Sequence, residues 1–322
     1  MPPPDEFAWI DRLKPLTRGD DRALGLEDDA AVIPGRPGFD LVVSKDAVVE
    51  GVHFPAGESA EGAAQRLLRT SLSDLAAKAA EPFGYFLMTA WPAGRDWADR
   101  EAFIRGLATD GEAYGVALLG GDTVGTSGPL TLSATVMGWA PAGRTVLRSG
   151  ARAGDLLVVC GTIGDGWLGL RAAMGDLDDP SGFLTERYRR PRPLFNLRDT
   201  LREWARAAAD VSDGLVADAG HIARASRLAL TLELKATPRS TAANAWLDVQ
   251  PNHASALADL ATGGDDYAVV CAVDPADEAL FHAGARAAGV ESATVGAFGV
   301  GAGVQVNVGG RLITLKSAGW RH

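Results

Sequence analysis

The pattern of hydrophobic and polar positions changes its period along the first half of the chain. Apolar residues at three- and four-residue spacing predict a helix over 60–80, which Pro82 ends, and an amphipathic helix over 97–114. Short apolar runs predict two buried strands, 40–44 and 85–91, and residues 130–139 predict a long strand of alternating character. The run VALLGGDT predicts a further strand that leads into a glycine turn. This half therefore predicts a mixed α/β layer of three or four strands and two helices.

The texture of the chain changes at PAGRTVLRSGARAGD, which is rich in turn formers and arginine. We place a domain boundary there and expect two domains, 1–143 and 144–322. The second domain begins with the apolar strand DLLVVCG, and helices are expected near 164–174, 184–190 and 197–209. A short strand into VSDGL, a helix to Arg227 and the strand LALTLEL follow, and helix and strand alternate from 254 to 315. The periods alone indicate the α/β class (α+β) and nothing finer.

The composition is that of an ordinary globular protein with an acidic surface. Of 322 residues, 47% are hydrophobic and 22% charged, which is enough for two packed cores. The net charge of -10 argues against a nucleic-acid or membrane partner, because an anionic partner needs a basic surface. No apolar segment is as long as a membrane span, and MPPPDEF lacks the pattern of a secretory signal. Cys160 and Cys271 lie in apolar runs, so we expect buried, unpaired thiols and a cytoplasmic protein.

Aspartates recur beside small residues where predicted strands end or turns begin. They are Asp28 and Asp29 in LEDDAAVIP, Asp46 after the first strand, Asp74 within the first helix, Asp122 at a strand end in LLGGDT, Asp210 and Asp213 in DVSDGL, and Asp265 and Asp266 in TGGDDY. Each one alone is most often a cap or turn residue that accepts backbone N–H groups. Their shared setting favours another use, because Mg²⁺ takes one or two carboxylates from a protein and completes its shell with phosphates and water. Several separated aspartates therefore indicate more than one metal ion.

Other phosphate-binding patterns are weak or absent. The run Gly161–Gly166 follows a strand and precedes a helix, but its spacing differs from GxGxxG. The chain has no GxxxxGKS or GxxxxGKT segment, and it has no HRD and DFG pair. A P-loop and a protein-kinase site are therefore excluded.

Motifs along nearly the whole chain occur in the order found in one enzyme family. DDAAV, SKDAVVEGVHF, SLSDLAAKAAEP and LLGGDT lie in the first domain, and RSGARAGDLLVVCGTIGDGWLGL, DVSDGLVADAGHIARAS and TGGDDYAVV lie in the second. Together they resemble the thiamine-monophosphate kinase family, within the superfamily of aminoimidazole ribonucleotide synthetase, selenophosphate synthetase and a hydrogenase maturation factor. VEGVHF and LSDLAA are particular to this branch. The resemblance implies the two-domain aminoimidazole ribonucleotide synthetase-like fold, with the first domain contributing strands to a barrel shared by a homodimer.

The same resemblance implies a function and a site. The implied reaction is ATP-dependent phosphorylation of thiamine monophosphate to thiamine diphosphate, with release of ADP. The first domain would bind ATP and magnesium, and the second would complete the nucleotide and substrate site. Magnesium ligands would be Asp29, Ser44, Asp46, Asp74, Asp122, Asp210 and Asp213. ATP contacts would be Tyr114, Gly121, Asp122, Arg148 and Ser212, and substrate contacts would be His53, Asp265 and Trp320.

Several residues depart from the family pattern. Lys45 stands where Thr or Ser is usual, Lys78 replaces Met, and Val124 follows GDT where a second Thr is common. Glu27 replaces the glycine before the aspartate pair, and Asp265 replaces Glu. None of these changes removes a principal ligand, so the departures bear on substrate affinity rather than on the implied chemistry.

The implied chemistry needs no general base from the protein. The nucleophile is an oxygen of the substrate's own phosphate, whose second pKa is about 6, so this group is largely ionised near neutral pH. Repulsion between two polyanions is the obstacle in a chain of charge -10. Magnesium ions would neutralise that charge and hold an in-line geometry, while Arg148 would grip the phosphates. We therefore expect direct transfer without a phosphoenzyme.

Two other interpretations stay open. The first is another ATP-using enzyme of the superfamily, of the selenophosphate or aminoimidazole ribonucleotide synthetase type. A selenophosphate synthetase would carry a reactive cysteine near its N-terminus, and none precedes Cys160. The second is a non-catalytic homologue that binds nucleotide or metal, although such a protein would be expected to have lost ligands.

Overall fold

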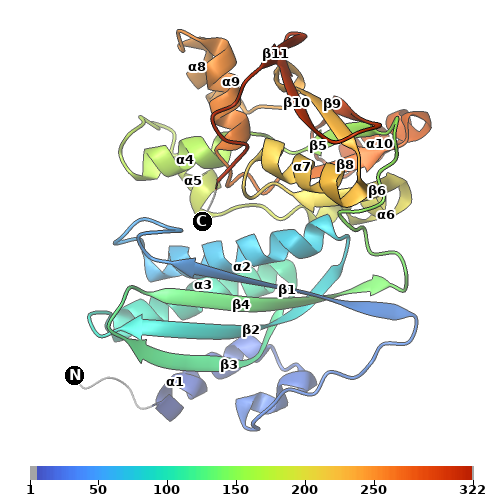
Figure 1. The fold of residues 1–322 in the computed structure, drawn as a ribbon. Coiled ribbons are helices and arrows are strands. Elements are labelled where there is room, and N and C mark those ends of the chain that lie inside the picture. Colours follow the sequence, from blue (N-terminus) through green and yellow to red (C-terminus); the bar gives the residue numbers. More distant parts are fainter. Residues whose placement is uncertain (1–5, 321–322) are drawn as a thin grey trace. The chain divides into compact units, whose positions relative to one another are not determined.

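The computed structural model describes residues 6–320 and divides into two compact units. One unit is Met1–Leu75 with Ala80–Gly143, and the other is Ala76–Ala79 with Arg144–His322 (Figure 1). The stretch MPPPD, in which we expect no secretory signal, lies outside the described residues. Among residues 6–320, no helix combines the length and the hydropathy that a membrane crossing needs.

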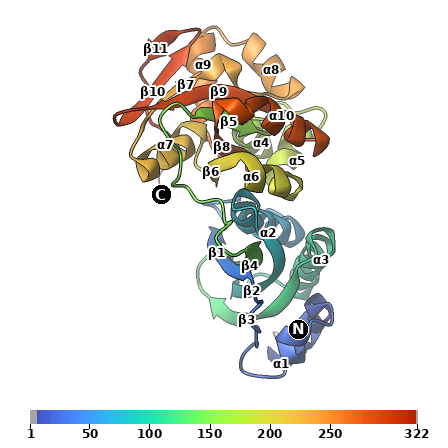
Figure 2. The same ribbon diagram turned by 90° about the vertical axis from the view of Figure 1, so that its right-hand side faces the viewer.

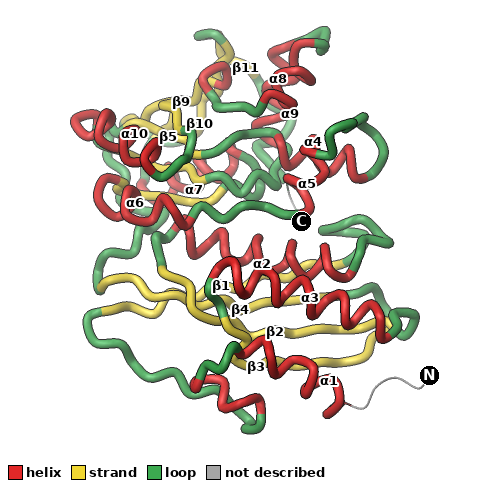
Figure 3. Tube along the Cα trace, turned by 180° about the vertical axis from the view of Figure 1, so that it is seen from behind, coloured by secondary structure: helices red, strands yellow, loops and turns green. Residues whose placement is uncertain are grey.

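The first unit is a four-stranded sheet with helices across one face. Its strands are β1 (Phe39–Val49), β2 (Glu81–Pro92), β3 (Ala117–Thr126) and β4 (Thr131–Pro141), in the order β1-β4-β2-β3. Strand β4 runs antiparallel to β1 and β2, whereas β2 and β3 run parallel. The helices α2 (Ala60–Ala77) and α3 (Trp97–Tyr114) lie across one face of this sheet (Figure 2, Figure 3). Before β1 come α1 (Glu6–Leu13) and two 3₁₀ helices, η1 (Lys14–Thr17) and η2 (Asp21–Leu26).

Both helices predicted in this unit are confirmed, and their ends have local causes. Helix α3 begins where the side chain of Asp96 accepts the backbone N–H of Asp99 at 3.1 Å. It ends where Gly115 adopts a left-handed conformation that costs glycine little. Helix α2 ends at Ala77, and the chain enters β2 at Glu81, one residue before Pro82.

Two expectations for the strands of this unit are wrong. Strand β1 is not buried, because the side chains of Leu41 and Val43 are 44% and 52% exposed on the face away from α2. The run VALLGGDT does not end in a glycine turn, since β3 continues through Asp122 to Thr126. Asp122 and Asp46 therefore lie inside strands and not at strand ends.

The second unit is built on a seven-stranded mixed sheet in the order β11-β10-β7-β9-β5-β8-β6. Its strands are β5 (Leu156–Cys160), β6 (Ala205–Asp210), β7 (Ala229–Glu233), β8 (Val269–Val273), β9 (Ser292–Gly299), β10 (Gly303–Val308) and β11 (Arg311–Ile313). Its helices are α4 (Asp165–Ala173), α5 (Phe183–Arg189), α6 (Arg198–Trp204), α7 (Leu215–Ser226), α8 (Thr241–Asp248), α9 (His253–Thr262) and α10 (Glu278–Ala287). Single 3₁₀ turns occur at Phe195–Leu197, Leu234–Ala236 and Pro275–Asp277.

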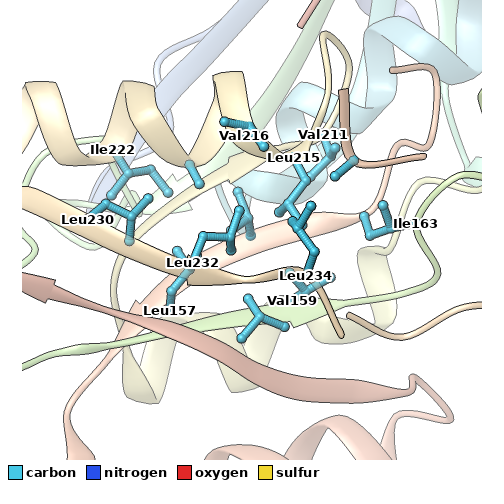
Figure 4. Packing of buried hydrophobic residues seen from close by; sticks show 14 of the residues in the cluster. Leu157, Val159, Ile163, Val211, Leu215, Val216, Ile222, Leu230, Leu232 and Leu234 are labelled. Atoms are coloured by element: carbon cyan, nitrogen blue, oxygen red, sulfur yellow. The ribbon is translucent and has the colours of Figure 1, made fainter. Parts of the chain in front are cut away.

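The central strand β5 is buried on both faces, which explains its continuous apolar run. Leu157 and Val159 join the core under α7, whereas Val158 and Cys160 join the core with residues of α6 and α10. Figure 4 shows the first of these cores, with Ile222 of α7 pointing toward the strands. Cys160 and Cys271 are buried and unpaired, as expected.

One helix of the second unit is shorter than its sequence predicts. The expected helix over 197–209 ends at Trp204, and Ala205–Asp210 forms strand β6 along β8. Alanine favours helices, but the ladder with β8 buries this alanine run between two cores, and tertiary packing overrides propensity.

Candidate active site

Three of the predicted metal ligands lie together in the first unit. Ser44 and Asp46 are two positions apart on β1 and so share the face that α2 covers, and Asp74 lies on α2. The Ser44 hydroxyl donates to the Asp74 carboxylate. Burial, followed by the nearby charge of Asp74, raises the pKa of Asp46 to about 6, while a hydrogen bond from Ser71 lowers it. Two carboxylates at this proximity repel each other, and a divalent cation would relieve that repulsion.

Two further predicted ligands border a separate pocket of the same unit. Asp29 and Asp122 line a pocket of about 350 Å³, together with Gly121 and the inner residues of α1. The Asp122 Oδ1 atom accepts the backbone N–H of Thr123 at 2.8 Å, which orients the carboxylate. A side chain cannot replace Gly121, because a Cβ there would lie 1.9 Å from the carbonyl oxygen of Leu87 on β2.

The sheet register sets the separation of these two groups. Asp46 lies opposite Ala134, Ala134 lies opposite Leu87, and Leu87 lies opposite Gly121. One row therefore crosses all four strands, and its ends are about 14 Å apart at the usual strand spacing. The first unit thus presents two groups of carboxylates and not one enclosed cage.

Other predicted residues of the first unit lie outside both groups. The Nδ1 atom of His53 accepts the backbone N–H of Val49 at 3.1 Å, so the imidazole is held at the end of β1. Tyr114 ends α3, and the Arg69 guanidinium lies 5.6 Å from its ring centroid. Lys45 donates to the Ser133 hydroxyl at 2.9 Å, and strand alternation directs it away from the face of Ser44 and Asp46.

In the second unit, the loop Ser212–Gly214 follows Asp210, which is buried at the end of β6. The three backbone N–H groups of this loop donate to Oδ2 of Asp218, each at 3.1 Å. Asp218 lies in the first turn of α7 and is 1% exposed. Burial, followed by the charge of Asp213, raises the pKa of Asp218 to about 7.

The remaining predicted residues of this unit gather around the same loop. The backbone N–H of Asp265 donates to the Ser212 carbonyl at 2.8 Å, and that of Trp320 donates to the Asp213 carbonyl at 2.9 Å. Arg148 is close enough for its charge to lower the pKa of Asp218 and of His221. For His221 the larger causes are burial and the charge of Arg224.

A pocket of about 890 Å³ opens beside this loop. Asp213, His221 and Trp320 line it, and the Trp320 side chain is 57% exposed. Ligand atoms of Asp213, Asp218 and His221 lie within 4.8 Å of one another, which is close enough for a cation. Asp218 and His221 were not among the predicted site residues, although their three-residue spacing in DVSDGLVADAGHI places both on one side of α7.

The neighbouring aspartate of the TGGDDY motif has a structural role. Asp266 is buried and accepts the backbone N–H groups of Gly164 and Gly166, each at 2.9 Å. Burial raises the pKa of Asp266 to about 8, although these N–H donors lower it. The glycine run Gly161–Gly166 therefore uses these N–H groups to hold a carboxylate of the chain itself.

The chain is similar to known proteins over nearly its whole length. Residues 27–140 match the model of the AIR synthase related protein N-terminal domain, and residues 152–309 match that of its C-terminal domain. The thiamine-monophosphate kinase of Caulobacter vibrioides is 56% identical over 321 residues, which are 99% of this chain and 91% of that protein. This chain belongs to the thiamine-monophosphate kinase family.

Solved structures agree with this family assignment. The thiamine-monophosphate kinase of Stenotrophomonas maltophilia has a TM-score of 0.84 and 35% identity, covering 94% of this chain and 96% of that one. A structure of AaThiL complexed with AMPPCP and TMP has a TM-score of 0.77 and 25% identity, covering 98% and 96%. The chain therefore has the two-domain AIR synthase-like fold that its motifs imply.

Proposed function

We propose that this member of the thiamine-monophosphate kinase family transfers the terminal phosphoryl group of ATP to thiamine monophosphate, giving thiamine diphosphate and ADP. The observation that carries this proposal is the 56% identity with the Caulobacter kinase over 99% of the chain. A relative of the same fold binds the ATP analogue AMPPCP together with TMP, and AMPPCP occupies the place of ATP in this scheme.

The carboxylates of the first unit fit magnesium. Asp46 and Asp74 with the Ser44 hydroxyl form an all-oxygen group, which Mg²⁺ prefers over nitrogen and sulfur donors. Asp29 and Asp122 offer a second group at the pocket that Gly121 lines. When bound, magnesium supplies the positive charge that lets two phosphate chains approach each other. We assign to the second unit a further share of the metal ligands, Asp210 and Asp213.

In the reaction, a phosphate oxygen of the substrate attacks the γ-phosphorus of ATP, and the bond from that phosphorus to the β,γ-bridging oxygen breaks. ADP leaves with the electron pair, and no proton has to be removed, because the attacking oxygen is already ionised. Arg148 is exposed beside the Ser212–Gly214 loop, where a guanidinium can hold phosphate oxygens in pairs. Ser212 contacts ATP from the same loop in this scheme.

For the substrate, the pocket that Trp320 lines offers an exposed indole, and Asp265 lies outside its lining, bonded through its backbone N–H to the Ser212 carbonyl. Trp320 would stack on the aromatic rings of thiamine monophosphate, and Asp265 would attract its positively charged ring. His53 and Tyr114 keep their assigned contacts, with substrate and adenine respectively.

We also propose a homodimer and a cytoplasmic location. On the face of the first sheet away from α2, Leu41, Val43, Met88 and Val124 are exposed large hydrophobic side chains, and a second copy of the chain would cover them. Light scattering on the purified protein should give twice the chain mass of 33.5 kDa, and a single-chain mass would contradict the dimer. The buried free thiols suit a reducing compartment.

The activity is tested with purified protein, Mg²⁺, ATP and thiamine monophosphate. Chromatography should detect thiamine diphosphate and ADP in equal amounts, and omission of Mg²⁺ should abolish both. Parallel reactions receive selenide or an aminoimidazole precursor in place of thiamine monophosphate. Turnover in either of these, with no thiamine diphosphate in the first, would assign the chain to the other superfamily reaction. ATP binding without turnover of any substrate would indicate a non-catalytic homologue.

A further inference from the structure

The loop Ser212–Gly214 is held by one buried carboxylate. Its three consecutive backbone N–H groups point at a single oxygen, Oδ2 of Asp218, at 3.1 Å each. A loop backbone has few other partners in a buried setting, and three unsatisfied donors would be costly. Asp218 is 1% exposed, so water has little access to replace it.

The carbonyl side of the same loop holds two other segments of the chain. The Ser212 carbonyl accepts the N–H of Asp265, and the Asp213 carbonyl accepts the N–H of Trp320. Both segments approach closely through a glycine. A Cβ at Gly264 would lie 2.6 Å from the Ser212 carbonyl oxygen, and one at Gly319 would lie 2.5 Å from that of Asp213.

We propose that Asp218 is a positioning residue for both reactants, because it fixes a loop that carries one assigned ATP contact, Ser212, and binds two assigned substrate contacts, Asp265 and Trp320. Ser212 and Asp213 lie on the loop itself, and Asp265 and Trp320 are hydrogen-bonded to its carbonyls. Asp218 touches neither reactant and acts through these four residues. This inference rests on the proposed kinase function and adds a residue that none of the assigned contacts includes.

Kinetic constants distinguish a positioning role of Asp218 from a role in folding alone. A variant that merely unfolds part of the population lowers the apparent kcat and leaves KM unchanged, since the folded molecules are normal. A displaced loop moves contacts to both reactants, so it raises KM for ATP and for thiamine monophosphate while kcat falls. The oxygen is needed as an acceptor, so an amide should restore part of what alanine loses.

The experiment compares Asp218→Ala and Asp218→Asn with Glu233→Ala. Glu233 is a matched control, because its carboxylate also accepts three backbone N–H groups, from Lys235, Gly309 and Gly310, at a turn away from the loop. For Asp218→Ala we expect both KM values to rise at least tenfold and kcat/KM to fall at least 100-fold. Asp218→Asn should recover at least tenfold of that loss, and Glu233→Ala should keep both KM values within twofold.

Unchanged KM values in Asp218→Ala, with a thermal midpoint lowered as in Glu233→Ala, would overturn the inference. If Asp218→Ala does not fold, Gly319→Ala tests the loop position instead. Its methyl group would clash with the Asp213 carbonyl and displace the loop from the Trp320 side. It should raise KM for thiamine monophosphate at least tenfold, and an unchanged KM contradicts the proposal. The wild-type reaction in the same assay separates the two claims, since absence of product there refutes the kinase function itself.

Discussion

A methyl group at Gly121 is the most severe small change that the structure identifies near the proposed phosphate site. In Gly121→Ala the new Cβ would lie 1.9 Å from the Leu87 carbonyl oxygen, whereas real Cβ contacts essentially never fall below 3.0 Å. Strand β3 must therefore move away from β2 by about 1 Å, which disturbs the parallel ladder that pairs Leu87 with Gly121. Overpacking costs about 1–3 kcal/mol, and each strained ladder bond adds about 1 kcal/mol. We expect a total loss of about 3–5 kcal/mol.

The assay is thermal unfolding of the variant beside Gly125→Ala. Gly125 is on the same strand, and a Cβ there meets nothing within 4 Å. Gly121→Ala should unfold at a temperature lower by about 10 °C or more, and it should bind ATP at least tenfold more weakly because Asp122 moves with the strand. Gly125→Ala should match the wild type in both. A thermal midpoint of Gly121→Ala within 2 °C of the wild-type value would show that the close approach of β2 does not exclude a Cβ at this position.

Three further substitutions test Asp122, Trp9 and Asp266. Asp122→Asn keeps an oxygen for the Thr123 N–H and removes the charge, so kcat should fall at least 100-fold at an unchanged thermal midpoint; unchanged turnover would exclude Asp122 as a ligand. Trp9→Phe removes the 2.9 Å bond from the indole N–H to the Thr123 hydroxyl and leaves a gap, which should cost about 1–3 kcal/mol by urea unfolding. The raised pKa of Asp266, about 8, means that the folded state holds its proton more tightly than the unfolded state, so stability declines as pH rises toward 8. The free energy of unfolding should fall by at most about 1.4 kcal/mol per pH unit. Between pH 6 and 8 this fall should be shallower in Asp266→Asn than in the wild type. Equal slopes in the two proteins would contradict a raised pKa of Asp266.

The helices of the first unit could be predicted because their signals are local. Spacing of apolar residues, the Asp96 cap and Gly115 act within a few positions of one another, so α3 has the expected bounds. The course of β3 could not be predicted in this way. Its glycines look like turn formers in the sequence, but position 121 requires glycine because Leu87 of β2 passes close to it. Leu87 is distant along the chain, so the local sequence does not reveal this requirement.

Some residues of the candidate site could likewise be predicted from the sequence, and others could not. Motifs identify the family and point to Asp46, Asp74 and Asp122, because their local sequence is characteristic. The role of Asp218 could not be predicted, since it depends on three N–H groups of a preceding loop that converge on one oxygen. The same holds for Asp266, whose partners Gly164 and Gly166 lie about a hundred positions away. Sequence spacing carries no signal of the Asp266 contacts, whereas the loop that Asp218 holds lies only four to six positions before it.

Direct phosphoryl transfer to thiamine monophosphate can be tested by following the terminal phosphoryl group of ATP. Purified protein is mixed with Mg²⁺, thiamine monophosphate and ATP labelled at the γ-phosphorus, and the label is located in product, protein and free phosphate. We expect label in the terminal phosphate of thiamine diphosphate and none retained by the protein, because the substrate's phosphate oxygen attacks directly. Label trapped on the protein, or released only as free phosphate, would contradict direct transfer.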